Sequence, residues 1–256
     1  MSKSLAIASG KGGVGKTTMA VNLALLDAIN NKSMLLDADM GMSNAHILLG
    51  INPTTTVHEV LEGKSSLENS IVKGPNGLNF LSGGSGITEL LNIDKTKRFN
   101  FIRSFDSLSS SIDSLIIDVS AGAEESALNM ISSADKILIV LVNEPTSFMD
   151  AFTLIKICNL ELKFKEFCVV VNMVNSESEG KKIFDKFKNI VTKFYDINIT
   201  YTGSMLLIPT IKSSILKKKP VVLDKKNISI INLFNRILEN IYKAPINENS
   251  GIKFFN

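Results

Sequence analysis

A glycine-rich run near the start of the sequence, GKGGVGKTT at residues 10–18, has the residue types and spacing needed to bind phosphate. It contains the pattern G-x-x-x-x-G-K-[ST], directly after a predicted strand and at the start of a predicted helix. Its glycines let consecutive backbone N–H groups point at phosphate oxygens, and the helix N-terminus adds positive potential. Lys16 is then expected to reach the β- and γ-phosphates, and the Thr17 hydroxyl to bind Mg²⁺. The run predicts a nucleotide site formed by Gly12, Gly13, Val14, Gly15, Lys16, Thr17 and Thr18.

Lys11 is a second cation in the same loop, which the general pattern does not require. It is either a solvated loop lysine or a cation supplied to the phosphates of a neighbouring subunit, as an arginine finger is. Arginine is scarce in this chain, at three of the 28 basic residues. Because arginine is so poorly represented, any catalytic cation is predicted to be a lysine.

Two carboxylates, Asp37 and Asp39, follow the second predicted strand. Residues two apart on an extended segment point the same way, here toward the carboxyl end of the strand, where α/β sheets bind ligands. Asp39 is placed to orient or deprotonate an attacking water, with Asn44 as a polar contact in the same loop. The plainer role of capping a turn fits Asp37 better.

Asp118 ends a further apolar strand, Leu115-Ile116-Ile117-Asp118. A carboxylate in this position beside a phosphate loop holds the Mg²⁺ shell, usually through water. The small residues at 120–123 allow the following loop to come close to the terminal phosphate. The predicted metal ligands are therefore Thr17 and Asp118. The predicted catalytic residues are Lys16 and Asp39, together with Lys11 if it serves the phosphates of a neighbouring subunit.

These residues need a parallel sheet to bring them together. Short apolar or β-branched segments alternate with segments of helical period, which predicts an α/β fold with a doubly wound, mostly parallel sheet flanked by helices. Several segments are apolar at successive positions, as strands covered on both faces are. The predicted strands are Leu5–Ser9, Ser33–Asp37, Leu78–Leu81, Ser114–Asp118, Lys136–Val142, Phe167–Asn172 and Asn198–Gly203. The predicted helices are Lys16–Ala28, Ile87–Ser109, Glu125–Ser132, Ser147–Leu160, Glu179–Phe194 and Ile228–Tyr242.

The composition agrees with one ATPase-sized domain over residues 1–243, followed by a short polar linker and tail at 244–256. A net charge of +3 argues against a dedicated nucleic-acid coat, and two cysteines exclude a disulfide framework or a four-cysteine zinc site. The first residues lack the build of a signal peptide, and no apolar segment reaches the length of a membrane span. A cytoplasmic location is expected.

The loop K-G-G-V-G-K-T-T resembles the deviant Walker A loop of the MinD/ParA ATPases, and the later motifs follow in that family's order over nearly the whole chain. The resemblance implies a P-loop NTPase of the SIMIBI type that uses ATP and Mg²⁺ and forms an ATP-bound homodimer, with Lys11 crossing the interface. It also implies that Asp39 takes the hydrolytic role and that the D-x-x-A-G segment from Asp118 senses the bound nucleotide. By the same resemblance, Asn172 hydrogen-bonds adenine and residues 209–222 close over the base.

Three further stretches resemble the FlhG, FleN or YlxH subgroup, which regulates flagellar number and placement. They are LSGGSGITEL at 81–90, NEPTSFMDAF at 143–152 and DMGMSN at 39–44. This resemblance implies a slowly hydrolysing switch at the inner face of the membrane, with an FlhF-like GTPase or a flagellar basal-body protein as partner. MinD-like placement of the division site and ParA-like DNA partition are the alternatives, as is a scaffold that binds nucleotide without hydrolysing it.

Two features near the end of the sequence bear on surface binding. The segment GIKFF at 251–255 is equally well explained as a weak anchor to an anionic membrane and as a frayed terminus. The apolar stripe within 228–242 favours a core helix over an amphipathic anchor. Five lysines at 217–219 and 225–226 form the densest basic patch, which suits DNA, anionic lipid or a solvated loop beside the nucleotide.

Overall fold

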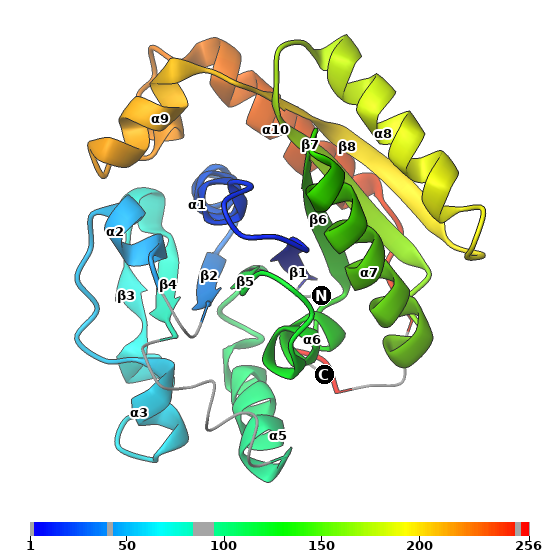
Figure 1. Ribbon diagram of the computed structural model, residues 1–256. Coiled ribbons are helices and arrows are strands. Elements are labelled where there is room, and N and C mark those ends of the chain that lie inside the picture. Colours follow the sequence, from blue (N-terminus) through cyan, green and yellow to red (C-terminus); the bar gives the residue numbers. More distant parts are fainter. Residues whose placement is uncertain (1–2, 40–42, 84–94, 249–251, 256) are drawn as a thin grey trace.

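The computed structural model describes residues 3–39, 43–83, 95–248 and 252–255. Within them, strands form one sheet in the order β3-β4-β2-β5-β1-β6-β7-β8 (Figure 1), in which every neighbouring pair is parallel except β3 with β4. The strands are β1 (Lys3–Ala8), β2 (Ser33–Ala38), β3 (Val72–Lys73), β4 (Asn79–Ser82), β5 (Ser114–Val119), β6 (Lys136–Val142), β7 (Glu166–Val174) and β8 (Asn198–Leu206). The prediction of a mostly parallel sheet is confirmed.

Helices cover both faces of this sheet, which explains why its strands are apolar at successive positions. On β6, Ile137, Ile139 and Leu141 pack into the core beside α6 and α7, while Leu138 and Val140 pack into the core beside α1 and α10. The helices are α1 (Lys16–Asp27), α2 (Ala45–Leu49), α3 (Val57–Leu61), α5 (Lys95–Ser104), α6 (Glu125–Ser132), α7 (Pro145–Leu162), α8 (Glu177–Val191), α9 (Pro209–Leu216) and α10 (Ile228–Lys243).

The predicted strands are all present, with ends that differ from the prediction by at most three residues. The sequence did not indicate β3, α2, α3 or α9; β3 has two residues, and α2 and α3 have five each, which is little more than one helical turn. The predicted helix over 87–109 is in part α5, which a 3₁₀ turn at Phe105–Leu108 follows; residues 84–94 lie outside the described part of the chain.

The helix α10 is a core element, as its apolar stripe predicted. Its buried residues are Ile230, Leu233, Phe234, Ile237, Leu238 and Ile241. In the described part of the chain, none of the helices combines the length and the apolar character that a membrane crossing requires.

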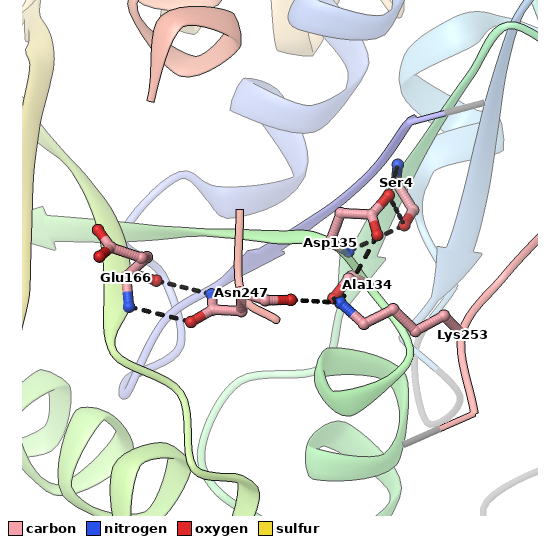
Figure 2. A network of polar contacts seen from close by, with 6 residues as sticks. All are labelled: Ser4, Ala134, Asp135, Glu166, Asn247 and Lys253. Atoms are coloured by element: carbon pink, nitrogen blue, oxygen red, sulfur yellow. Dashed lines mark hydrogen bonds and ion pairs between the residues drawn. The ribbon is translucent and has the colours of Figure 1, made fainter. Parts of the chain in front are cut away.

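The C-terminal segment 252–255 packs against the fold. The Phe254 side chain is 3% exposed, its N–H donates to the Ser133 carbonyl at 3.0 Å, and its ring meets Phe105 edge-on at 4.9 Å. The Lys253 ammonium donates to the Asn247 carbonyl at 2.7 Å (Figure 2). In this structure Phe254 is therefore a core residue, whereas Ile252 of the same segment is exposed.

Candidate nucleotide site

The glycine-rich loop connects β1 to α1 at the carboxyl edge of the sheet, and its backbone requires glycine at several positions. Gly13 and Gly15 have φ of 81° and 88°, in the left-handed region. A Cβ atom on Gly10 would lie 2.2 Å from the backbone of Asp150, and one on Gly15 would lie 2.4 Å from the Asn172 amide. The loop can therefore close only with glycine at these places.

A cavity of about 420 Å³ opens beside this loop. It is lined by the predicted residues Lys11, Gly12, Gly13, Gly15, Lys16, Thr17, Thr18, Asp39 and Asn172. Val14 differs from its loop neighbours because it is buried in the core, at 3% exposure, and does not line the cavity. The fold thus gathers predicted residues from three separate stretches of sequence at one cavity.

Lys16 and Asp118 form a buried ion pair at the inner end of the loop. The Lys16 Nζ atom lies 2.7 Å from Asp118 Oδ1, with the side chains 7% and 1% exposed. Burial raises the pKa of Asp118, and the nearby Lys16 ammonium and Thr17 hydroxyl oppose that rise. The second carboxylate oxygen, Asp118 Oδ2, is buried without a hydrogen-bond partner in the described residues. An unsatisfied buried carboxylate oxygen next to a threonine hydroxyl fits the shell of a Mg²⁺ ion.

The two aspartates after β2 have different surroundings. Asp37 is buried and holds the following loop, because it accepts hydrogen bonds from the Ser43 hydroxyl (2.6 Å) and the backbone N–H groups of Ala45 (3.0 Å) and Asp39 (3.2 Å). Burial, together with the charge of Asp118, raises the pKa of Asp37 to about 6. Asp39 is half-buried and lines the cavity. Asp37 thus caps the turn, and the carboxylate of Asp39 faces the cavity.

Lys11 contacts the start of α7. Its Nζ atom lies 2.8 Å from Glu144 Oε2 and 3.1 Å from Thr146 Oγ1. The Lys11 and Glu144 side chains are 41% and 56% exposed, so this pair is solvated and contributes at most about 1 kcal/mol. Lys11 is thus held within its own chain by a contact that is easily broken.

The outer half of the cavity is apolar. Ile208 and three residues of α9 (Ile211, Lys212 and Ile215) line it, which places the predicted base-covering segment at the site. Asn172 donates an amide hydrogen to the Val14 carbonyl at 2.8 Å and lines the cavity. Residues that sequence reasoning missed complete the wall: Met19, Met173, Met205, Leu206, Leu207 and Phe234. Nothing distinguishes such apolar residues from core residues in a sequence.

Two of the features singled out in the sequence lie away from the cavity. Asn44 is exposed at the N-cap of α2 and is not in the wall. The lysines at 217–219 and 225–226 are exposed on the segments after α9. Cys158 and Cys168 are buried, which raises the pKa of each thiol to about 12.

Comparison with known proteins gives a consistent set of relatives. The ParA family model, described as NUBPL iron-transfer P-loop NTPase, matches residues 1–242. The antiactivator FleN of Pseudomonas aeruginosa is 31% identical over 98% of this chain and 91% of its own length. The flagellum site-determining protein YlxH of Helicobacter pylori is 29% identical over 84% of this chain and 72% of its own. The MinD structure in the MinC:MinD cell division complex of Aquifex aeolicus superimposes with a TM-score of 0.78 and 26% identity, over 94% of this chain and 96% of that one.

Proposed function

The chain belongs to the ParA family of P-loop NTPases, and from this premise we propose that it is an ATP-driven dimerisation switch that regulates flagellar number or placement. The observation that carries the proposal is the gathering of Lys11, Lys16, Asp39 and Asp118 around one phosphate loop. The resemblance to FleN and YlxH, which are named as flagellar proteins, supports the biological role.

Nucleotide binding would exchange the partners of a buried ion pair. Lys16 would turn from Asp118 to the β- and γ-phosphates, which carry more negative charge than one carboxylate. Asp118 would keep its charge balanced by joining the metal shell with Thr17, since its Oδ2 atom is already without a partner in the described residues. A bound Mg²⁺ ion would neutralise charge on the phosphates. ATP and Mg²⁺ are therefore expected to bind together.

Hydrolysis would depend on Asp39. Its carboxylate is half-buried at the cavity and lies in a loop that Asp37 holds in place. From there it would orient the attacking water or accept its proton. A slow reaction at this site would act as a timer.

Dimerisation would engage Lys11. In the single chain Lys11 contacts Glu144 and Thr146, and its exposed position lets it move. In the dimer it would leave Glu144 for the partner's phosphates and supply the charge that an arginine finger supplies elsewhere. The ATP dimer would hold its partners, for which an FlhF-like GTPase and a basal-body protein are the candidates, at the inner face of the membrane. The ADP-bound monomer would release them.

A genetic replacement tests the flagellar role. In the cells from which the chain comes, the gene would be deleted and restored as wild type or as Lys16→Ala, and flagella would be counted by electron microscopy. We expect altered flagellar number or position in the deletion strain, corrected by the wild type and not by Lys16→Ala. Normal flagella with misplaced septa would instead support the MinD-like role, which the 26% identity to MinD favours as the second candidate.

Turnover measurements separate the remaining candidates. We expect hydrolysis that anionic vesicles or a flagellar partner stimulates. Stimulation by DNA with a steep salt dependence would point to the partition role and to the exposed lysines at 217–219 and 225–226. Absence of hydrolysis under all of these conditions would contradict the switch and support a scaffold.

A further inference from the structure

A second cavity, of about 580 Å³, lies at the amino edge of the sheet. Its walls include Leu5 on β1, Ile116 on β5 and Leu238 and Ile241 on α10. Because β1 leads from this edge to the phosphate loop, the sheet separates the cavity from the nucleotide site. The volume is in the range of roughly 300–1,000 Å³ that is usual for small-molecule pockets. It is about four times that of the ~150 Å³ engineered apolar cavity that binds benzene or xenon.

The polar side chains in its wall are already engaged with other groups of the protein. The Lys136 ammonium donates to the carbonyls of Ile241 (2.7 Å), Tyr242 (2.9 Å) and Ala244, which uses all three of its hydrogens. The hydroxyl of Tyr242 donates to the Asp27 carboxylate outside the cavity wall. The Lys136 ammonium and the Tyr242 hydroxyl therefore bind groups of the protein. A ligand in this cavity has to be recognised mainly by apolar contacts.

Two further polar residues of the wall, Ser4 and Asp135, belong to the network that fixes the C-terminal segment (Figure 2), and the Ser114 hydroxyl donates to Asp27. The Asp135 carboxylate accepts hydrogen bonds from the N–H (3.0 Å) and hydroxyl (2.9 Å) of Ser4 and pairs with Lys253 at 3.6 Å. Phe254 and Phe255 then form one side of the cavity. One wall is therefore the C-terminal segment, which is held by these polar contacts and by the packing of Phe254 against Phe105.

We propose that this cavity binds a single aliphatic chain, from a free fatty acid or from a membrane lipid. Branched aliphatic side chains form much of its wall, and an apolar chain would supply the contacts that an empty cavity lacks. Ile246 is 51% exposed and lines the cavity, so it marks the mouth, where the polar head of the ligand remains in water. The site is independent of the proposed nucleotide switch.

A pair of tryptophan variants in the same segment tests the site. Ile246→Trp narrows the mouth, and Ile252→Trp is the matched control, because Ile252 is also exposed (40%) but does not line the cavity. Dodecanoate below its micelle concentration would be titrated calorimetrically into the full chain and into both variants, with melting curves as a second readout. Dodecyltrimethylammonium, with the opposite head charge, would report whether the chain or the head is recognised.

We expect saturable one-to-one binding of both amphiphiles and a melting temperature that rises with their concentration. Ile246→Trp should weaken binding by at least about tenfold, and Ile252→Trp by less than about twofold. Sedimentation with phosphatidylcholine vesicles then identifies the source: co-sedimentation that Ile246→Trp abolishes indicates a lipid chain, and its absence despite dodecanoate binding indicates a free fatty acid. The proposal is overturned if neither amphiphile binds, or if both variants bind as the wild type does.

Discussion

Charged side chains at the two edges of the sheet have different kinds of partners. At the carboxyl edge, Lys16 and Lys11 each contact a carboxylate, and Asp118 Oδ2 is buried without a partner in the described chain. At the amino edge, Asp27 accepts hydrogen bonds from Ser33, Ser114 and Tyr242, and Lys136 binds three carbonyls at the end of α10. The first arrangement is open to ligands with phosphate and metal charge. In the second arrangement Asp27 and Lys136 bind groups of the protein itself, and these contacts stabilise the fold.

The largest effect is expected at the carboxyl edge from Lys16→Ala. Loss of two charge-assisted hydrogen bonds to phosphate, at about 2 kcal/mol each, should weaken ATP binding by about 1000-fold. Fluorescence titration with a labelled ATP analogue measures this change. A melting curve is the control, because the variant also leaves Asp118 buried without its cation. Affinity within about threefold of wild type would show that Lys16 does not bind phosphate.

At the amino edge, Lys136→Met should lower the stability of the fold without changing the affinity for ATP. Methionine keeps the length of the buried stem but removes the ammonium that donates to three carbonyls at the end of α10, so the free energy of unfolding should fall by about 3 kcal/mol. Urea denaturation measures the change, and Lys243→Met, at an exposed position on the same helix, is the control. A large loss of ATP affinity in the folded variant would mean that the two edges are coupled.

The pH dependence of stability should report Asp37. Its pKa in the folded chain is about 6 against an ordinary value of 3.8, so the folded state binds the proton more tightly than the unfolded state. This carboxyl group therefore favours the folded state below about pH 4, and that contribution is lost as the pH rises to about 6, by at most about 3 kcal/mol.

The difference in unfolding free energy between wild type and Asp37→Asn, measured with a chelator from pH 4 to 7.5, isolates this contribution. The wild type should lose stability relative to Asp37→Asn as the pH rises through the range between the two pKa values. A difference that does not vary with pH would show that burial and the charge of Asp118 do not raise the pKa of Asp37 in the folded chain.

The smallest effect is expected from Asp118→Asn in the absence of Mg²⁺. Removing the carboxylate frees Lys16 from its ion pair, so ADP without metal should bind about threefold to tenfold more tightly than it binds the wild type. Added Mg²⁺ should then strengthen ADP binding in the wild type and not in the variant. Equal dependence of ADP binding on Mg²⁺ in both proteins would show that Asp118 does not belong to the metal shell.

The carboxyl edge could be predicted from sequence better than the amino edge, and the reason is physical. Phosphate binding needs a fixed loop of glycines with Lys16 and Thr17 behind it, so the pattern is local in the chain. The apolar side of the nucleotide cavity, with Met173 and Phe234, depends on packing between distant segments, and such residues have no pattern of their own. Asn172 was found only through resemblance to a family.

The amino edge was largely hidden because its contacts join residues far apart in the chain. Lys253 and Phe254 looked like an exposed or frayed end, and the lysine finds its partners at Asp135 and Asn247 only in the folded chain. Lys136 looked like the first residue of an ordinary strand, which it is, yet its side chain caps α10. A one-dimensional period cannot report such long-range pairs.

The central claim is that the carboxyl edge exchanges its internal ion pairs for ATP and then for a second chain. The most direct test is the mass in solution of Asp39→Ala with Mg²⁺ and ATP, determined by light scattering after size exclusion. We expect twice the chain mass of 27.9 kDa with ATP and the single mass with ADP. We also expect a monomer when Lys11→Ala is added to Asp39→Ala. A variant Asp39→Ala that binds ATP and stays monomeric would contradict the account.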